Sequence, residues 1–261
     1  MHPAMTKRRS PAFDRVTIDA LTIEDEQSFR HVALYADLKD VLRRDDYTFR
    51  VQRGRKVRGD RALLLNLTYF CASDGGDILA QPSLPADVVT HVAWHHLASK
   101  ALGGSRAVEA LFLGEAIASA FDVYLIGRLL GHSPRSSFLA TQVPAIAEAA
   151  KAAGLSKRGF EALLHRVARH PEQAFEELRS LLFDATLALY ASRTPEEAAV
   201  ALETFDRHRF SPVMHHYELS NWVLHARAYG DARADRKARA IDRALRREAK
   251  PLAWLTEAWG E

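Results

Sequence analysis

The sequence predicts a mainly α-helical protein with a small N-terminal β part, an α+β fold. Two observations support this class. Short apolar runs rich in β-favouring residues occur before the prolines of Gln81-Pro-Ser-Leu-Pro85, whereas from residue 86 onward the apolar spacing is helical. The chain of 261 residues is 48% hydrophobic and 26% charged, an ordinary globular balance that can bury a large core.

The N-terminal part is expected to combine short strands with one helix. The turn signal Ser73-Asp-Gly-Gly76 separates two strands, and the prolines of 81–85 are expected to end regular structure. In order, the predicted elements are a strand at 13–18, a helix at about 25–44, a strand at 47–52, a buried strand at 61–72 and a paired strand at 77–80.

The C-terminal part is expected to be helical. Pro85 and Gly103-Gly104 bracket the first helix. Thr194-Pro195-Glu196-Glu197 signals a helix start, with a capping hydroxyl, a proline in the first turn and acids at the positive end of the helix dipole. The predicted helices span 87–102, 106–130, 144–153, 157–169, 171–192, 195–207, 212–230 and 232–261, the last interrupted at Pro251.

These patterns divide the chain into a disordered tail (1–12), a mixed α/β part (13–85) and a helical body (86–261) that carries the candidate site. The lone Cys71 excludes an internal disulfide and fits a reducing compartment. No secretory signal is evident at the N-terminus. We expect a cytoplasmic protein without a membrane span, because charges interrupt the longest apolar segment at Glu109, Glu115, Asp122 and Arg128.

The net charge is +3, and basic residues concentrate at 50–61 and 227–250. Either group could meet nucleic acid. However, the second group carries interleaved acids, which is typical of a solvated helix face, and the first lies in a glycine-punctuated stretch typical of a hairpin turn. We therefore expect a small-molecule or protein partner rather than nucleic acid, and an oligomer is compatible with the sequence.

The most informative pattern joins two predicted helices. His91 and His95 are four residues apart, so their rings share one helix face, and the Gly103-Gly104 turn lets the next helix pack antiparallel. That helix carries Glu115 among apolar neighbours, where burial requires a metal, an arginine or a histidine as partner. Two His and one Glu form the ligand set of a catalytic zinc site with an open fourth position. The alternative is a polar network in which the histidines are hydrogen-bonded to protein groups and bind no metal.

Three further residues are expected to lie near the proposed metal ligands. Asp122, two turns after Glu115, and Asp87, one turn before His91, are expected to orient the ligating side chains. His96 points about 100° away from His95 and faces either a substrate cleft or solvent.

The run His91-Val-Ala-Trp-His95, followed by Glu115-Ala-Ile-Ala-Ser-Ala-Phe121, resembles the gluzincin group of zinc metallopeptidases, thermolysin-like in spacing. The resemblance covers about residues 61–125. It implies a zincin-like core with a strand beside the site helix, followed by a helical body, and zinc held by His91, His95 and Glu115, with iron as the alternative metal.

Two positions depart from the family pattern. Val92 occupies the place of the glutamate that activates water, and Ser119 occupies the place of an acidic residue one turn after the zinc-binding Glu. The resemblance therefore implies a metal site without conventional peptidase activity. Family members also use a downstream His or Tyr to stabilise an oxyanion, which makes His216 and Tyr217 candidates for catalysis beside His96. The alternative for these two residues is a solvated helix N-terminus.

Three functions follow. The first, which we favour, is a zincin-like metal-binding protein, either an enzyme of altered chemistry or a pseudo-enzyme. The second is a non-catalytic helical interaction or regulatory protein in which the His/Glu cluster is a buried polar network. The third is a nucleic-acid-associated protein that uses the basic helix at 227–250.

Overall fold

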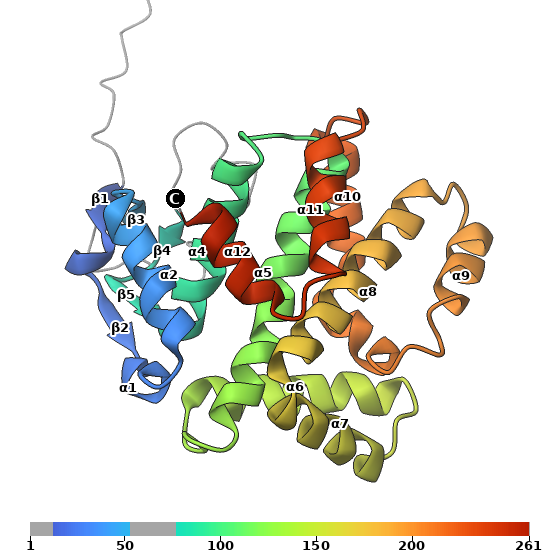
Figure 1. Ribbon diagram of the computed structural model, residues 1–261, viewed down its shortest axis with the longest axis horizontal. Coiled ribbons are helices and arrows are strands. Elements are labelled where there is room, and N and C mark those ends of the chain that lie inside the picture. The colour runs from blue at the N-terminus through green and yellow to red at the C-terminus, as the bar shows by residue number, and fades with distance from the viewer. Residues whose placement is uncertain (1–12, 53–76, 261) are drawn as a thin grey trace, which may run out of the picture. The chain divides into compact units, whose positions relative to one another are not determined.

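The computed structural model describes residues 13–52 and 77–260 (Figure 1). It confirms a mainly α-helical protein with a small β part. The expected tail at 1–12, the expected strand at 61–72 with Cys71, and most of the basic group at 50–61 lie outside the described residues. The chain divides into two compact units, one of Met1–Glu24 and Asp40–Pro85, the other of Asp25–Lys39 and Ala86–Glu261.

The first unit contains the strands. Its central strand is β3 (Thr48–Gln52), which runs antiparallel to β1 (Phe13–Thr17) and parallel to β4 (Ile78–Leu79). Phe49 and Val51 of β3 are buried while their neighbours are half-buried, as the alternation of a strand with one covered face requires. The strands expected at 13–18, 47–52 and 77–80 are thus confirmed, and the last pairs with β3.

A second, two-stranded sheet corrects the sequence analysis. β2 (Thr22–Glu24), which follows a 3-10 turn η1 (Ile18–Ala20), pairs in parallel with β5 (Ser83–Pro85). The prolines of 81–85 do end the element before them, because β4 stops at Leu79, but the strand at Ser83–Pro85 was not predicted. Leu84 is fully buried, which stabilises the short pairing, and Pro85 stands at the end of its strand, where a missing N–H removes no ladder hydrogen bond.

The second unit is helical. A short α1 (Glu26–Phe29) precedes α2 (Ala33–Arg44), which passes into the first unit at Asp40. The remaining elements are α4 (Ala86–Ala101), α5 (Val108–Leu129), α6 (Ser137–Ala152), α7 (Lys157–Arg169), α8 (Pro171–Ala191), α9 (Pro195–Glu203), the 3-10 helix η3 (Ser211–Tyr217), α10 (Leu219–Tyr229), α11 (Arg236–Leu245) and α12 (Pro251–Trp259).

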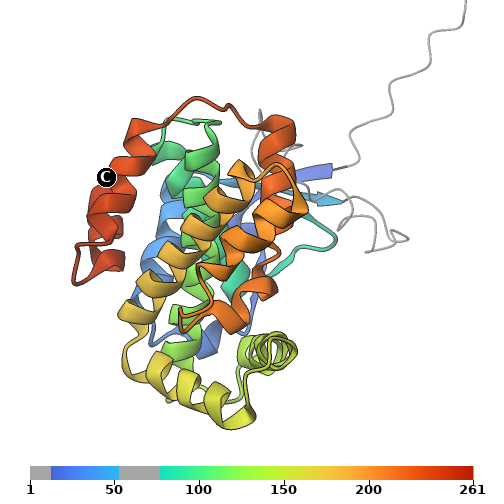
Figure 2. The same cartoon turned by 90° about the vertical axis from the view of Figure 1, so that its right-hand side faces the viewer.

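Helix α5 is the core of this unit. It packs against α4, α7, α8, α10 and α11, and α8 runs beside it in both views (Figures 1 and 2). By length and composition α5 is long and apolar enough to cross a membrane, but 83% of its most apolar window is buried within the protein. A helix that is apolar on all sides and covered by other helices is a core helix. Gly127 allows α5 to approach the backbone of α7 closely, because a Cβ at this position would lie only 2.6 Å from the Val167 carbonyl oxygen.

Helix α4 packs along α5 through aromatic contacts. Trp94 is fully buried, with its ring 5.5 Å from that of Phe121 on α5 and 6.4 Å from that of Trp259 on α12. Edge-on aromatic contacts of this kind add to the free energy gained by burial. These contacts fix the rotation of α4 about its own axis. They thereby also fix the directions in which the other side chains of α4 point.

Three predicted helices differ in their boundaries. The helix expected at 25–44 is broken between Phe29 and Ala33, which allows both Phe29 and Val32 to be buried. The helix expected from Pro144 begins at Ser137. Pro144 is accepted inside it because Pro144 and Ala140 are exposed, so the Ala140 carbonyl that loses its N–H partner faces water.

The third difference concerns 212–230. The structure has η3 and α10 there instead of one helix, because Glu218 adopts a left-handed conformation with φ 49° that interrupts the helix. The interruption expected at Pro251 is confirmed, because the last segment forms α11 and then α12, which begins at Pro251.

A buried ion pair links α8 to α11 and yields a stability prediction. The Arg179 guanidinium is fully buried and donates to both carboxylate oxygens of Glu176 at 2.6 and 2.7 Å and to Asp242 at 2.9 Å. Replacing Asp242 by Ala should lower the free energy of unfolding by about 3 kcal/mol, because part of a buried charge loses its partner. Chemical denaturation measures this change.

Arg233→Ala is the matched control, because its ion pair with Asp231 lies at the surface. It should leave the unfolding midpoint unchanged. Equal effects of the two substitutions would contradict the assignment of Arg179 and Asp242 as a buried link.

Candidate metal centre

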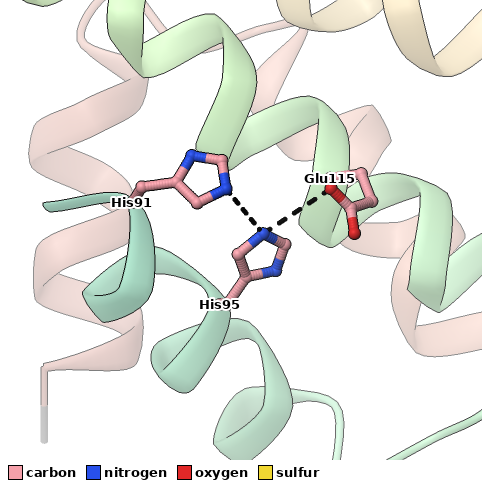
Figure 3. Close-up of side chains that lie close together, drawn as sticks. All are labelled: His91, His95 and Glu115. Atoms are coloured by element: carbon pink, nitrogen blue, oxygen red, sulfur yellow. Dashed lines mark hydrogen bonds and ion pairs between the residues drawn. The ribbon is translucent and has the colours of Figure 1, made fainter. Parts of the chain in front are cut away.

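The structure brings His91, His95 and Glu115 together (Figure 3). One donor atom from each residue lies within 4.8 Å of the other two. The His91 Nε2 and His95 Nε2 atoms are 3.2 Å apart, and His95 Nε2 lies 3.6 Å from Glu115 Oε2. Donors held 2.0–2.1 Å from a tetrahedral zinc are about 3.3 Å apart, so the two separations at His95 are close to those of a zinc site, and the His91 and Glu115 donors lie within 4.8 Å of each other.

Local structure explains why the three side chains meet. The rings of His91 and His95 stand one turn apart on α4 with their centroids 4.8 Å apart. The chain reverses at Gly103 and Gly104, whose positive φ values of 63° and 65° suit glycine. A Cβ at Gly114 would lie 4.0 Å from His95 Nδ1, so Nδ1 faces the α5 backbone while Nε2 faces Glu115.

The electrostatics of the cluster keep His91 in the form that binds metal. Burial, with His95 as a second contribution, lowers the pKa of His91 to about 4, so its ring is neutral at physiological pH. The neutral imidazole is the form that binds metal. Burial raises the pKa of Glu115, and the nearby imidazoles of His91 and His225 oppose that rise. A bound cation would favour the ionised carboxylate.

The cluster is partly open to solvent. The side chains of His95 and Glu115 are 36% and 25% exposed. The expectation that Glu115 is buried therefore holds only in part. Leu111, one turn earlier on α5, is also half-buried, so this face of the helix is less covered than the others. An ion or a small ligand can reach the donors from solvent.

Asp87 and Asp122 form a second polar pair along the same helix seam. Because α4 and α5 meet at His95 and Glu115 and run antiparallel, Asp87 and Asp122 face each other further along, and each is half-buried. Burial raises the pKa of both carboxyls, and Asp87 adds to the rise at Asp122. Among the described residues, no hydrogen bond joins His91 to either aspartate, so their expected orienting role stays a prediction.

The three candidate catalytic residues lie outside the cluster. His96 is half-buried on α4, rotated away from the face of His91 and His95. His216 and Tyr217 belong to η3, which packs against α6, and their rings meet edge-on at 5.0 Å. Tyr217 is buried, and its Oη has no hydrogen-bond partner among the described residues. Burial and the carboxyl of Asp122 raise its pKa.

One residue near the cluster was missed by the sequence analysis. His225 on α10 interacts electrostatically with Glu115. Its spacing with Trp222 indicates a core or boundary position and gives no sign of a link to a residue so distant in sequence.

The two positions at which the sequence departs from the zinc-peptidase pattern lie inside the protein. Val92 and Ser119 are both buried, with exposed fractions of 5% and 7%. In the described part of the chain, the cluster therefore holds ligand-type side chains without the glutamate next to the first His that a zinc peptidase uses to activate water. Comparison of the chain with protein-family models, curated protein sequences and solved structures finds no match.

The lowered pKa of His91 gives a pH prediction for the metal-free protein. As pH falls from 6.5 toward 4, the unfolded chain binds a proton that folded His91 does not, so the free energy of unfolding should fall over this window. The variant His91→Gln lacks this group and should lose less stability between the same pH values. Denaturation with a chelator present measures both proteins, and equal losses would contradict the assignment.

Proposed function

We propose that the protein binds one transition-metal ion through His91, His95 and Glu115. The observation that carries this proposal is the convergence of their donor atoms within 4.8 Å. Two imidazoles and a carboxylate suit zinc, and the same donor set with open positions suits ferrous iron. The neutral state of His91 and the solvent access of Glu115 support binding without rearrangement of the helices.

We further propose that the centre is zincin-like and does not act as a conventional peptidase. The spacing of the three ligands on two antiparallel helices supports the first part, and the valine at position 92 supports the second. When bound, the metal would act as a Lewis acid toward a water or a carbonyl. The residue at 92 cannot accept the proton of an attacking water, so the protein is either an enzyme of different chemistry or a pseudo-enzyme.

A second candidate function has one observation in its favour. His91 and His95 lie at hydrogen-bond distance from each other, and His95 lies 3.6 Å from the Glu115 carboxylate. Such a network can be a structural feature of a helical interaction or regulatory protein. In that case the cluster contributes to stability alone, and function resides in a protein-binding surface.

The nucleic-acid alternative has less support. Several arginines of the basic segment pair with acids: Arg239 with Glu109, Arg246 with Asp184 at 2.7 Å, and Arg233 with Asp231 at 2.5 Å. Each pair reduces the positive charge that phosphates would meet. A small-molecule or protein partner and a cytoplasmic location remain part of the proposal.

Metal content tests the proposal. Protein purified without chelators or metal-affinity resin should contain about one equivalent of zinc or iron per chain. His91→Ala and Glu115→Ala should each weaken binding by more than the ~10–100-fold that follows loss of a residue that only orients a ligand. Elemental analysis and chelator competition measure these values.

The matched control is His96→Ala, which removes the neighbouring imidazole on another face of α4 and should retain the metal. The metal site would be refuted if the wild-type protein were purified without bound metal and the variants His91→Ala and Glu115→Ala were only less stable. That result would favour the structural network and direct the search to protein partners.

The missing base predicts an inactive peptidase. Zinc-loaded wild-type protein should hydrolyse unstructured protein or short peptides no faster than Glu115→Ala, because no carboxylate stands at position 92 to take up a proton. Fluorogenic peptide assays measure the rates. Hydrolysis that requires both zinc and Glu115 would overturn this part of the proposal.

A further inference from the structure

An open hollow lies where the beginning of α5 meets the beginning of α11. Its volume is about 710 Å³, and it is lined by residues of two segments, 105–107 and 231–237. A hollow of this size can hold a small molecule. None of the three proposed metal ligands is among its lining residues, so it is a separate candidate site.

Hydrogen bonds between the two segments give the hollow a fixed wall. The Asp231 N–H donates to the Arg106 carbonyl at 2.7 Å, and the Val108 N–H donates to the Asp231 carbonyl at 3.1 Å. The Ser105 hydroxyl donates to the Asp235 carboxylate at 2.6 Å. The segments are thus held together before any ligand arrives, which lowers the entropy that binding costs.

Positive charge exceeds negative charge in this hollow. Six ionisable side chains line it, four cationic and two acidic: Arg106, Arg233, Arg236, Lys237, Asp231 and Asp235. With all six ionised, four positive and two negative charges leave a net charge of +2. The four cationic residues are exposed, so an anion can reach them from solvent.

The two carboxylates already have donors within the protein. Asp231 accepts from the Arg233 guanidinium at 2.5 and 2.7 Å, which neutralises that arginine. Asp235 caps α11, because its Oδ1 accepts from the backbone N–H groups of Lys237 and Ala238 at 2.9 and 3.0 Å. Neither carboxylate therefore forms an ion pair with the other cationic side chains of the hollow.

Three cations of the hollow remain without a carboxylate partner. Arg236 and Lys237 form no side-chain ion pair within the described part of the chain, and Arg106 donates to the uncharged Tyr229 carbonyl at 2.6 Å. Like charges that line one hollow repel each other, and a bound anion would relieve this repulsion.

We propose that this hollow binds a small ligand through a phosphate group, with Arg106, Arg236 and Lys237 as its contacts. A phosphate monoester carries a charge of about −1.5 to −2 at pH 7, which matches the net charge of the hollow. A guanidinium can bind phosphate through two parallel hydrogen bonds, and a lysine adds a point charge. A confined hollow suits a small molecule, whereas a nucleic-acid strand needs a groove that follows several phosphates. The proposal does not depend on the metal centre.

The test titrates the full-length protein with inorganic phosphate at constant ionic strength and follows backbone amide NMR signals. Signals of residues 105–107 and 231–237 should shift. Affinity should fall at least about tenfold in the double variant Arg236→Gln/Lys237→Gln, which loses two charged donors. The matched control is Arg243→Gln/Arg247→Gln, an equal change of charge at exposed positions outside the hollow. Its affinity should stay within about twofold of wild type, because salt screens distant charges.

Three results would overturn the proposal. The first is the absence of shifts at the hollow in wild-type protein, and the second is an equal loss of affinity in both double variants, which would indicate general attraction to a basic surface. The third is binding of a short single-stranded DNA that is tighter than phosphate binding and depends equally on both pairs of residues. Thermal unfolding midpoints should be alike in all three proteins, because the substituted side chains are exposed.

A chelator separates this site from the metal centre. Phosphate affinity should be the same in the protein as purified and after addition of a chelator, because no proposed metal ligand lines the hollow. Phosphate binding that disappears with the chelator would place the anion at a metal ion and would also overturn the proposal.

Discussion

The helical unit depends on the burial of α5. This helix is mostly apolar around its circumference, and its apolar residues are buried because α4, α7, α8, α10 and α11 pack against it. Its charged residues limit how that cover can be built. A carboxylate placed in an apolar interface costs several kcal/mol unless a partner meets it, so each acidic residue of α5 restricts which residues may face it.

The partners come from different helices. Glu109 is met by Arg239 of α11 and by the backbone N–H of Asp235, and Glu115 by the imidazole of His95 on α4, whereas Asp122 lies within electrostatic range of Asp87. The pairing at Glu109 is charge-compensated and suits a structural role. Asp122 and Asp87 are two half-buried carboxyls whose pKa values burial raises, whereas Glu115 lies beside metal-type donors, of which His91 is neutral at physiological pH. The two acidic residues of α5 whose pKa values burial raises therefore lie on the side of the helix that meets α4.

The sequence predicted the features that depend on local spacing. His91, His95 and Glu115 could be found because a four-residue interval and a glycine turn bring them together without help from the rest of the chain. The central helices were predicted for the same reason. Features set by distant contacts were missed. The strand at Ser83–Pro85 depends on a partner at Thr22–Glu24, the break near Phe29 depends on tertiary burial, and the electrostatic effect of His225 on Glu115 depends on the packing of α10 against α5. Spacing along the chain contains no signal for any of these.

The short connection at Gly103 and Gly104 has a consequence for how the site assembles. All three donors belong to one helical hairpin, so bringing them together requires the closure of one short loop, and the entropy lost in that closure is small. Two neighbouring helices form such contacts early in folding, before distant segments meet. The ion proposed for these donors therefore needs only this hairpin, and it can bind while the C-terminal helices are still being synthesised. The helices that cover α5 would then pack against a hairpin that already holds its metal.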